Sequence, residues 1–142
     1  MPVDMDNETL HRFLTESYER LDAAETYIMA LQNDMKEEDS LLALIRVFHT
    51  FKGDATILEF EDMAILSHAT EDLLYLAREE SIVLSRSILD IIFESANQLR
   101  RLLSIMGETI LNRKNIKSDP SLTKLVAKIQ KVTQTSSKSK QI

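Results

Sequence analysis

Residues 41–58 read LLALIRVFHTFKGDATIL. Apolar side chains recur at every third or fourth position of this stretch, which is the spacing of one face of an α-helix. The members of that face are Leu41, Leu44, Ile45, Phe48, Phe51, Ala55 and Leu58. The stretch therefore predicts an amphipathic helix, which Asp39 or Ser40 can cap at its N-terminus.

Similar patterns predict a helix on each side of this stretch. The first runs from Asn7 to Gln32, and a polar turn follows it. The next begins at Glu61 or Asp62. Its expected inward positions are Ile65, Leu66, Ala69, Leu73, Leu76 and Ala77.

Two more helices are expected in the second half of the chain. Ser85 is a typical N-cap for a helix that ends either at Gly107 or after Leu111. Asp119 and Pro120 form a cap and first-turn pair for a shorter fifth helix.

The composition favours a single all-α domain. The chain has 142 residues but only 2 glycines and 2 prolines, too few turn formers for many short strands. Four amphipathic helices joined by short links predict an antiparallel four-helix bundle, with the additional C-terminal helix on its outside. We expect this domain to span residues 1–132. Ser, Thr, Lys and Gln dominate residues 133–142, which predicts a disordered tail.

The composition also disfavours several classes of protein. The chain has no cysteine, so it can form neither a disulfide nor a thiol nucleophile. Its net charge of -6 disfavours nucleic acid as a partner. No apolar run approaches the ~20 residues that span a bilayer, and the acidic start does not resemble a signal peptide. We therefore expect a cytoplasmic protein without membrane insertion.

The histidine of the opening stretch lies at the edge of the apolar face. With about 100° of rotation per residue, His49 is about 120° from the centre of that face. Lys52 and Gly53 follow at i+3 and i+4, so they share its side of the helix. A lone boundary histidine more often than not has no function. Glycine within a helix costs ~1 kcal/mol relative to alanine, so Gly53 beside an imidazole favours access for a partner.

The run from His49 to Gly53 resembles the H-x-x-K-G signature of histidine phosphotransfer (HPt) domains. From Glu8 to Leu103 the chain is most similar to the N-terminal phosphotransfer domain of the chemotaxis histidine kinase CheA family. The resemblance implies that an ATP-bound kinase domain phosphorylates His49 and that a response-regulator aspartate then takes the group. Lys52 would attract the phosphoryl group and partly offset its charge.

His68 and Glu71 gain a role only through this resemblance. Their spacing puts them on one helix face, and by themselves they indicate a surface pair that contributes little to folding. In the family, a histidine and a glutamate at this distance after the signature reach across to the phosphorylated histidine. The resemblance thus implies that Glu71 accepts a hydrogen bond from one nitrogen of His49 and leaves the other free to attack.

Two positions depart from the family pattern. Asp54 stands where the family usually has a small residue, and Thr56 stands where it often has glycine. The helical period turns Asp54 about 140° away from His49. Thr56 lies near His49 in projection and either trims access or supplies a hydroxyl. The remaining histidine, His11, is expected at the surface of the first helix.

The chain has no glycine-rich phosphate loop and no βαβ pattern. We therefore expect no cofactor in this domain and no ATP binding by it. ATP and magnesium would belong to a separate kinase domain of the same protein, acting in trans. The chain would be the N-terminal, phospho-accepting part of a longer sensor kinase.

Two other functions fit parts of the pattern. A metal-binding bundle could use His49, His68 and Glu71, but such sites usually have more carboxylates, and Lys52 would repel a cation. A non-catalytic helical adaptor could keep the fold without phosphotransfer. The intact set of candidate site residues speaks against that second alternative.

Overall fold

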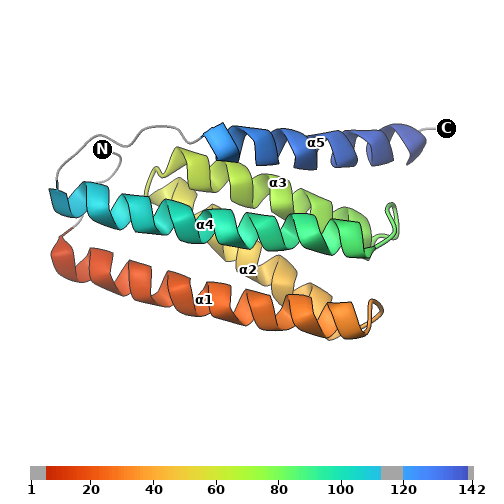
Figure 1. Ribbon diagram of the computed structural model, residues 1–142, viewed down its shortest axis with the longest axis horizontal. Helices are drawn as coiled ribbons and strands as arrows, with labels where there is room; N and C mark the ends of the chain where they lie inside the picture. Colours follow the sequence, from red (N-terminus) through yellow and green to blue (C-terminus); the bar gives the residue numbers. More distant parts are fainter. Residues whose placement is uncertain (1–5, 113–119, 141–142) are drawn as a thin grey trace.

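The computed structural model describes residues 6–112 and 120–140, and these residues form five helices. In chain order they are α1 (Asn7–Asn33), α2 (Glu38–Ile57), α3 (Glu61–Arg78), α4 (Arg86–Asn112) and α5 (Pro120–Lys140). Figure 1 shows α1 to α4 lying side by side and alternating in direction along the chain. The predicted all-α, antiparallel four-helix arrangement is therefore confirmed.

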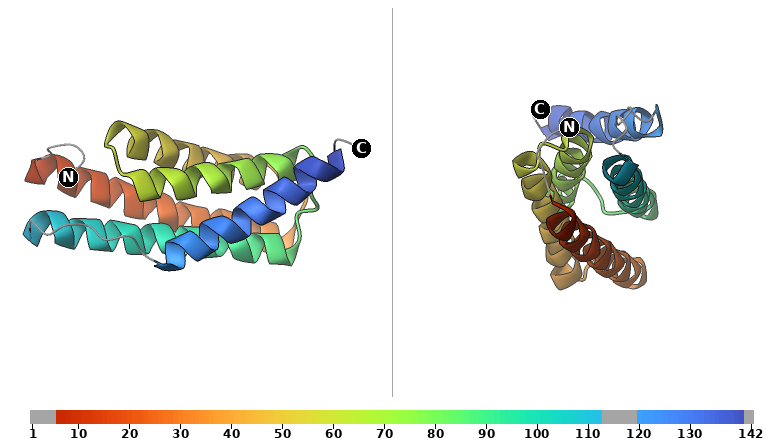
Figure 2. Two further views of the ribbon diagram at one scale, coloured as in Figure 1. Left: turned by 90° about the horizontal axis from the view of Figure 1, so that it is seen from above. Right: turned by 90° about the vertical axis from the view of Figure 1, so that its left-hand side faces the viewer.

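The four helices close into a bundle. Both α2 and α4 pack against α1 on one side and against α3 on the other. The fifth helix lies outside this ring, where it crosses α3 and α4 obliquely (Figure 2). Over the described ranges, no helix combines the length and apolarity needed to cross a membrane.

The rotation of α2 is fixed by two phenylalanines. Phe48 and Phe51 are both 0% exposed in the core. Burying a side chain of this size contributes roughly 1.5–3 kcal/mol, so turning α2 about its axis would be costly. Because His49 follows Phe48 directly, the same rotation places the imidazole on the outside of the bundle.

The starts of α4 and α2 differ in how they are capped. The Ser85 hydroxyl accepts a hydrogen bond from the amide of Ile88 (3.3 Å), as its prediction as an N-cap requires. The start of α2 differs from the prediction, because Glu37 precedes the helix and makes no side-chain cap. The Asp34 carboxylate accepts from the Lys36 amide (3.0 Å) and tightens the turn, so the helix begins before Asp39.

One inward position of α3 was predicted wrongly. Ile65 is 44% exposed, whereas Met63 and Leu74 are buried. The helix is covered on three sides, by α2, α4 and α5, and Ile65 faces the remaining open side. The sequence pattern alone does not reveal how many neighbours cover a helix.

The fourth helix ends at the later of its two predicted positions. It passes through Gly107 and ends at Asn112. A Cβ atom at Gly107 would lie 3.3 Å from Leu14 Cδ1, so this glycine allows α4 to approach α1 closely. Tertiary packing thus outweighs the cost of a glycine within the helix.

The fifth helix begins at Pro120 as predicted, while Asp119 lies outside the described residues. It continues to Lys140, so it occupies most of the segment predicted to be a disordered tail. The Thr133 and Thr135 hydroxyls donate to carbonyls one turn earlier (3.3 and 2.8 Å). These bonds satisfy the threonine hydroxyls within the helix, so a composition rich in Ser and Thr does not prevent a helix here. A domain boundary at residue 132 stays a prediction.

Candidate functional site

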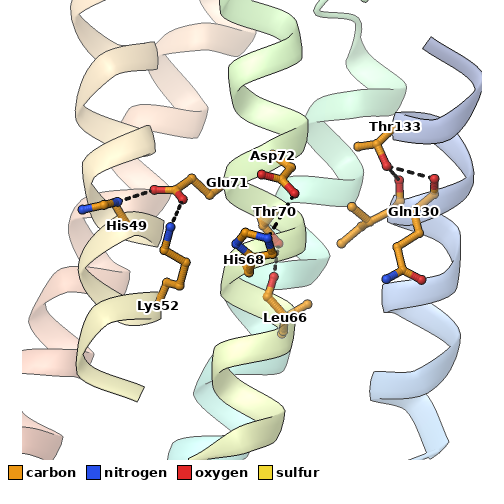
Figure 3. Close-up of polar contacts among 10 residues, drawn as sticks. His49, Lys52, Leu66, His68, Thr70, Glu71, Asp72, Gln130 and Thr133 are labelled. Atoms are coloured by element: carbon orange, nitrogen blue, oxygen red, sulfur yellow. Dashed lines mark hydrogen bonds and ion pairs between the residues drawn. The ribbon is translucent and has the colours of Figure 1, made fainter. Parts of the chain in front are cut away.

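An exposed imidazole and a buried carboxylate meet between α2 and α3. His49 Nδ1 lies 2.6 Å from Glu71 Oε2 (Figure 3). The His49 side chain is 65% exposed, whereas the Glu71 side chain is 3% exposed. Glu71 is therefore a core residue, and its prediction as half of a surface pair is wrong.

A lysine occupies the other oxygen of the same carboxylate. Lys52 Nζ donates to Glu71 Oε1 over 2.6 Å, and its side chain is 29% exposed. One carboxylate thus receives two short hydrogen bonds from α2, at positions three residues apart on one helix face. A buried charge with paired partners is far less costly than an isolated one.

The environment keeps Glu71 ionised. Burial in the core raises the pKa of the Glu71 carboxyl, but the hydrogen bonds from Lys52 and His49 and the lysine charge outweigh it. The pKa therefore lies below its ordinary value of 4.5. An ionised carboxylate only accepts hydrogen bonds, so Nδ1 of His49 is the nitrogen that carries the proton.

In the neutral imidazole, the second nitrogen of His49 then has the free lone pair. In Figure 3 this nitrogen, Nε2, is on the side of the ring that points away from Glu71 and from α3. Since most of the side chain is exposed, Nε2 is accessible to a partner from solvent. The arrangement presents one imidazole nitrogen as a nucleophile and fixes the tautomer through the other.

His68 does not reach across to His49. Its Nε2 pairs with Asp72 Oδ2 over 3.5 Å, one turn further along α3. Figure 3 shows the His68 ring on the outer face of α3, away from the contact between His49 and Glu71. Three residues advance a helix by about 300°, so His68 and Glu71 differ by about 60° in direction. That difference separates a core position from a surface one.

Gly53 leaves open space beside the imidazole. A Cβ atom placed there would meet nothing within 4 Å, and the backbone is an ordinary helix. Neither packing nor backbone conformation therefore explains this glycine. The neighbouring Thr56 hydroxyl donates to the Lys52 carbonyl (2.7 Å), so the threonine side chain is turned back onto its own helix.

Asp54 points away from the imidazole, as predicted, and has a partner on another helix. Its Oδ2 lies 3.6 Å from Nη1 of Arg20 on α1, and the Arg20 guanidinium lies 5.3 Å from the centre of the Phe51 ring. His11 is exposed, as expected. Among the described residues, no three His, Cys, Asp or Glu side chains gather as a metal ion would require.

Two arginines that line the space between α1 and α2 were not among the residues singled out from the sequence. Arg46 precedes His49 by three residues, so the same counting that selected Lys52 could have selected it. Arg20 could not be found this way, because it comes from α1 and reaches α2 only in the folded bundle.

Known proteins are similar to this chain in sequence. The model of the family described as "Hpt domain" matches residues 8–109. The chain is 27% identical to the sensor histidine kinase CheAY of Helicobacter pylori over 89% of its own length and 16% of that protein. It is 28% identical to the chemotaxis protein CheA of Treponema pallidum, over 71% of the chain and 13% of that protein. The chain thus spans less than a fifth of the length of these curated relatives.

Two solved structures are similar over most of the chain. The phosphorylated P1 domain of CheA3 from R. sphaeroides, solved in complex with CheY6, has a TM-score of 0.78 and 25% identity. It covers 91% of this chain and 98% of its own. The CheA phosphotransferase domain from Thermotoga maritima has a TM-score of 0.67 and 28% identity, with 71% and 96% covered. Sequence family, fold and the exposed histidine point to the same conclusion, and the chain belongs to the Hpt domain family.

Proposed function

We propose that His49 is the phosphoryl-carrying residue of a CheA-type phosphotransfer domain. The observation that carries the proposal is the contact between the buried Glu71 carboxylate and Nδ1 of His49, because in the neutral ring it leaves the lone pair on Nε2 of this exposed side chain. An ATP-bound kinase domain supplies the phosphoryl group, and the aspartate of a response-regulator receiver domain removes it. The family relationship supports this assignment, because its relatives are chemotaxis kinases.

In the first half-reaction, the lone pair of Nε2 attacks the γ-phosphorus of ATP. A nitrogen–phosphorus bond forms, the bond to the bridging oxygen breaks, and ADP leaves with that electron pair. The ring becomes positively charged, with the proton still on Nδ1. The Glu71 carboxylate, 2.6 Å away, stabilises this charge where it develops.

In the second half-reaction, a receiver aspartate attacks the same phosphorus. The nitrogen–phosphorus bond breaks and its electron pair returns to Nε2, so the neutral imidazole is restored. The proton on Nδ1 stays in place throughout, and Glu71 never needs to take it. We therefore assign Glu71 as a positioning and charge-stabilising residue.

Lys52 has two roles in this mechanism. Its ammonium holds the second oxygen of Glu71, which fixes the direction of the carboxylate. It is also the first cation after His49 on the same side of α2, so it attracts an incoming phosphoryl group. His68, on the outer face of α3, has no contact that assigns it a step.

ATP and magnesium belong to the separate kinase domain in this proposal. The chain lacks a phosphate-binding loop, and its exposed imidazole is suited to be a substrate for such a domain. We also propose a cytoplasmic location, because the reaction requires ATP and a receiver domain in the same compartment.

Labelling with a cognate CheA-type kinase domain and radioactive ATP tests the proposal. We expect one phosphoryl group per chain, labile in acid and stable in base, as phosphohistidine is. His49→Gln should abolish the label and leave the helical circular-dichroism spectrum unchanged. The matched control, His11→Gln on α1, should be labelled normally. Full labelling of His49→Gln would refute the assignment.

The adaptor alternative predicts a different result in the same experiment. An adaptor that has lost phosphotransfer would keep the fold but take up no label even in its unsubstituted form. A metal-binding bundle is disfavoured by the contacts themselves, since Lys52 occupies the second oxygen of Glu71.

A further inference from the structure

Two isoleucines are exposed on the side of the bundle that carries His49. Ile57, the last residue of α2, is 75% exposed, and Ile65 on α3 is 44% exposed. Exposed apolar side chains that occur singly are common and need no explanation. These two are not isolated, because they lie at the same level of adjacent helices.

The pairing of α2 with α3 sets this level. Glu71 contacts both His49 and Lys52, and the two helices run in opposite directions (Figure 1). Ile57 lies five residues after Lys52 on α2, and Ile65 lies six residues before Glu71 on α3. Both helices rise equally per residue, so these two steps lead in the same direction by similar distances. The isoleucines therefore flank the seam between α2 and α3, close to the turn that joins them.

Both isoleucines share the outer side of the bundle with the imidazole. On α2, His49, Gly53 and Ile57 are spaced by four residues, so each differs from the one before by about 40° in direction. On α3, Ile65 precedes His68 by three residues, so the two differ by about 60° and share the outer face of α3 seen in Figure 3. We call Ile57 and Ile65 the isoleucine patch.

The isoleucine patch is within reach of a partner docked at His49. Eight residues of helix separate His49 from Ile57, which corresponds to about 12 Å along α2. A standard interface covers about 800 Å² on each partner, and a round area of this size extends about 16 Å from its centre. Gly53 lies between the two residues and carries no side chain that would hold a partner away. A partner centred on His49 therefore also covers Ile57.

The opposite direction along α2 offers no such surface. One turn before His49, Ile45 is 5% exposed in the core, and Arg46 is exposed. Covering a charged side chain removes its hydration, whereas covering an exposed apolar side chain is favourable. A partner thus gains more by extending over Gly53 and Ile57 than by extending over Arg46.

We propose that the isoleucine patch is a docking surface for the response-regulator receiver domain, which covers it with apolar side chains beside its phosphoryl-accepting aspartate. The inference rests on the proposed function, because it requires a partner that docks at His49. Ile57 and Ile65 are assigned as residues that determine affinity for the receiver, and they do not touch the phosphoryl group.

The chemistry of the two half-reactions favours the receiver over the kinase domain as the occupant. An aspartate carboxylate is joined to the main chain through one methylene group. The surface of the receiver itself must therefore come within a side-chain length of the phosphoryl group on Nε2. In the kinase step, the reacting phosphorus is at the end of the triphosphate of ATP, which can extend from the kinase domain towards His49. The receiver consequently makes the closer approach to α2, and close approach is what buries Ile57.

Single-turnover transfer from the phosphorylated chain to a receiver domain tests the patch. The receiver is chosen from a panel as the one that dephosphorylates the unsubstituted chain fastest, and its concentration is varied. We expect Ile57→Ser to raise the half-saturating receiver concentration roughly 3–10-fold, as truncating an apolar interface residue typically does. The maximal transfer rate should stay the same. Added salt should not change the ratio between the two proteins, because an apolar contact is not screened.

Three further variants complete the experiment. Ile65→Ser should act in the same direction but more weakly, because Ile65 is less exposed before docking. Ile57→Leu should keep most of the affinity, because it retains the apolar area. Val83→Ser is the matched control, because Val83 is 82% exposed in the connection between α3 and α4, at the far end of α3 from the patch. It should leave transfer unchanged, and thermal melts of all these variants should match the unsubstituted domain.

Methyl nuclear magnetic resonance spectra give a readout that does not depend on phosphorylation. Adding unphosphorylated receiver to the domain should shift the methyl signals of Ile57 and Ile65 and leave those of Val83 in place. Unshifted isoleucine signals at receiver concentrations that saturate transfer would contradict the proposal.

The outcomes separate this inference from the proposed function. If the unsubstituted chain takes up no phosphoryl group from a kinase domain, the proposed function fails. If it is phosphorylated and transfers normally, but Ile57→Ser and Ile65→Ser behave like Val83→Ser, only the docking surface is refuted. A slower kinase step with an unchanged dependence on receiver concentration would also overturn the docking surface, because it would assign the patch to the kinase domain.

Discussion

The Glu71 carboxylate is buried beneath the exposed His49 ring and lies 2.6 Å from its Nδ1 atom. The two residues come from adjacent helices, so the packing of α2 on α3 sets the direction of the imidazole. Because the same carboxylate is bound by Lys52, its position does not depend on the histidine alone. The nitrogen that we propose to react, Nε2, is therefore oriented before any partner arrives.

Glu71→Gln should slow phosphorylation of His49 by the kinase domain. The neutral amide stabilises the positively charged ring less well and no longer requires the proton on Nδ1. Removing one preorganised group that stabilises charge in the transition state typically costs roughly 10²–10³-fold in rate, and we expect a loss in the lower part of that range. Transfer to the receiver should change less, because the imidazole is the leaving group in that step. Equal kinase-step rates for both proteins would remove Glu71 from the mechanism.

The same substitution should also destabilise the fold, contrary to what a surface position would imply. Removing a charged acceptor from two hydrogen bonds in a buried site costs about 1–3 kcal/mol. Urea unfolding followed by circular dichroism at neutral pH measures this difference. Arg86→Gln, at an exposed position at the start of α4, is a suitable control and should be neutral. A Glu71→Gln domain as stable as the unsubstituted one would contradict the observed burial.

The difference in the free energy of unfolding between the unsubstituted domain and Glu71→Gln should decrease as the pH falls. The folded-state pKa of Glu71 is lowered relative to its ordinary value of 4.5, so the folded domain favours the ionised form. Its contribution is complete above pH 4.5 and is lost as the pH falls through the folded-state value. The gap between the unsubstituted domain and Glu71→Gln should therefore narrow as urea titrations move from neutral pH into acid. A gap that stays constant below pH 4.5 would argue against this linkage.

The two glycines of the chain should respond differently to alanine. Gly53→Ala should stabilise the domain by up to ~1 kcal/mol, because its Cβ meets nothing within 4 Å. Gly107→Ala should gain less, because its Cβ would lie 3.3 Å from Leu14 Cδ1. Thermal unfolding of both variants makes the comparison. A larger gain at Gly107 would show that the space around these positions is not as described.

A larger side chain at Gly53 should impair function while keeping the fold. Gly53→Leu should slow phosphorylation and dephosphorylation of His49, because the side chain would occupy the space through which partners approach. Gly53→Ala separates the loss of glycine from the effect of bulk. If Gly53→Leu were phosphorylated as fast as Gly53→Ala, the access argument would be wrong.

His68 should matter little for the chemistry in this domain. Its pair with Asp72 is exposed, with 60% and 53% of the two side chains accessible. His68→Gln should change the free energy of unfolding by no more than about 0.5 kcal/mol, as is usual for such pairs. Its kinase-step rate should match that of Asp72→Asn. A loss in His68→Gln as large as that in Glu71→Gln would mean that His68 swings towards His49 during the reaction.

Much of the fold could be predicted from the sequence, because the apolar period of each helix is regular. His49, Lys52 and Gly53 could also be predicted together, since i+3 and i+4 spacing depends only on the local helix. The burial of Glu71 could not, because it depends on how α3 is rotated against α2. Glu71 follows His68 by three residues, and this spacing does not indicate how the helix is rotated. The pairing of Asp54 with Arg20 could not be predicted for the same reason, because it joins two helices.

Identifying the phosphorylated nitrogen tests the proposed role of His49 and Glu71 directly. The domain is labelled with nitrogen-15 in its histidines and phosphorylated by a cognate kinase domain, and long-range proton–nitrogen correlation spectra are recorded. We expect a phosphorus atom bonded to Nε2 of His49, while Nδ1 remains protonated and His11 and His68 are unchanged. A bond at Nδ1 of His49, or at either of the other two histidines, would contradict it.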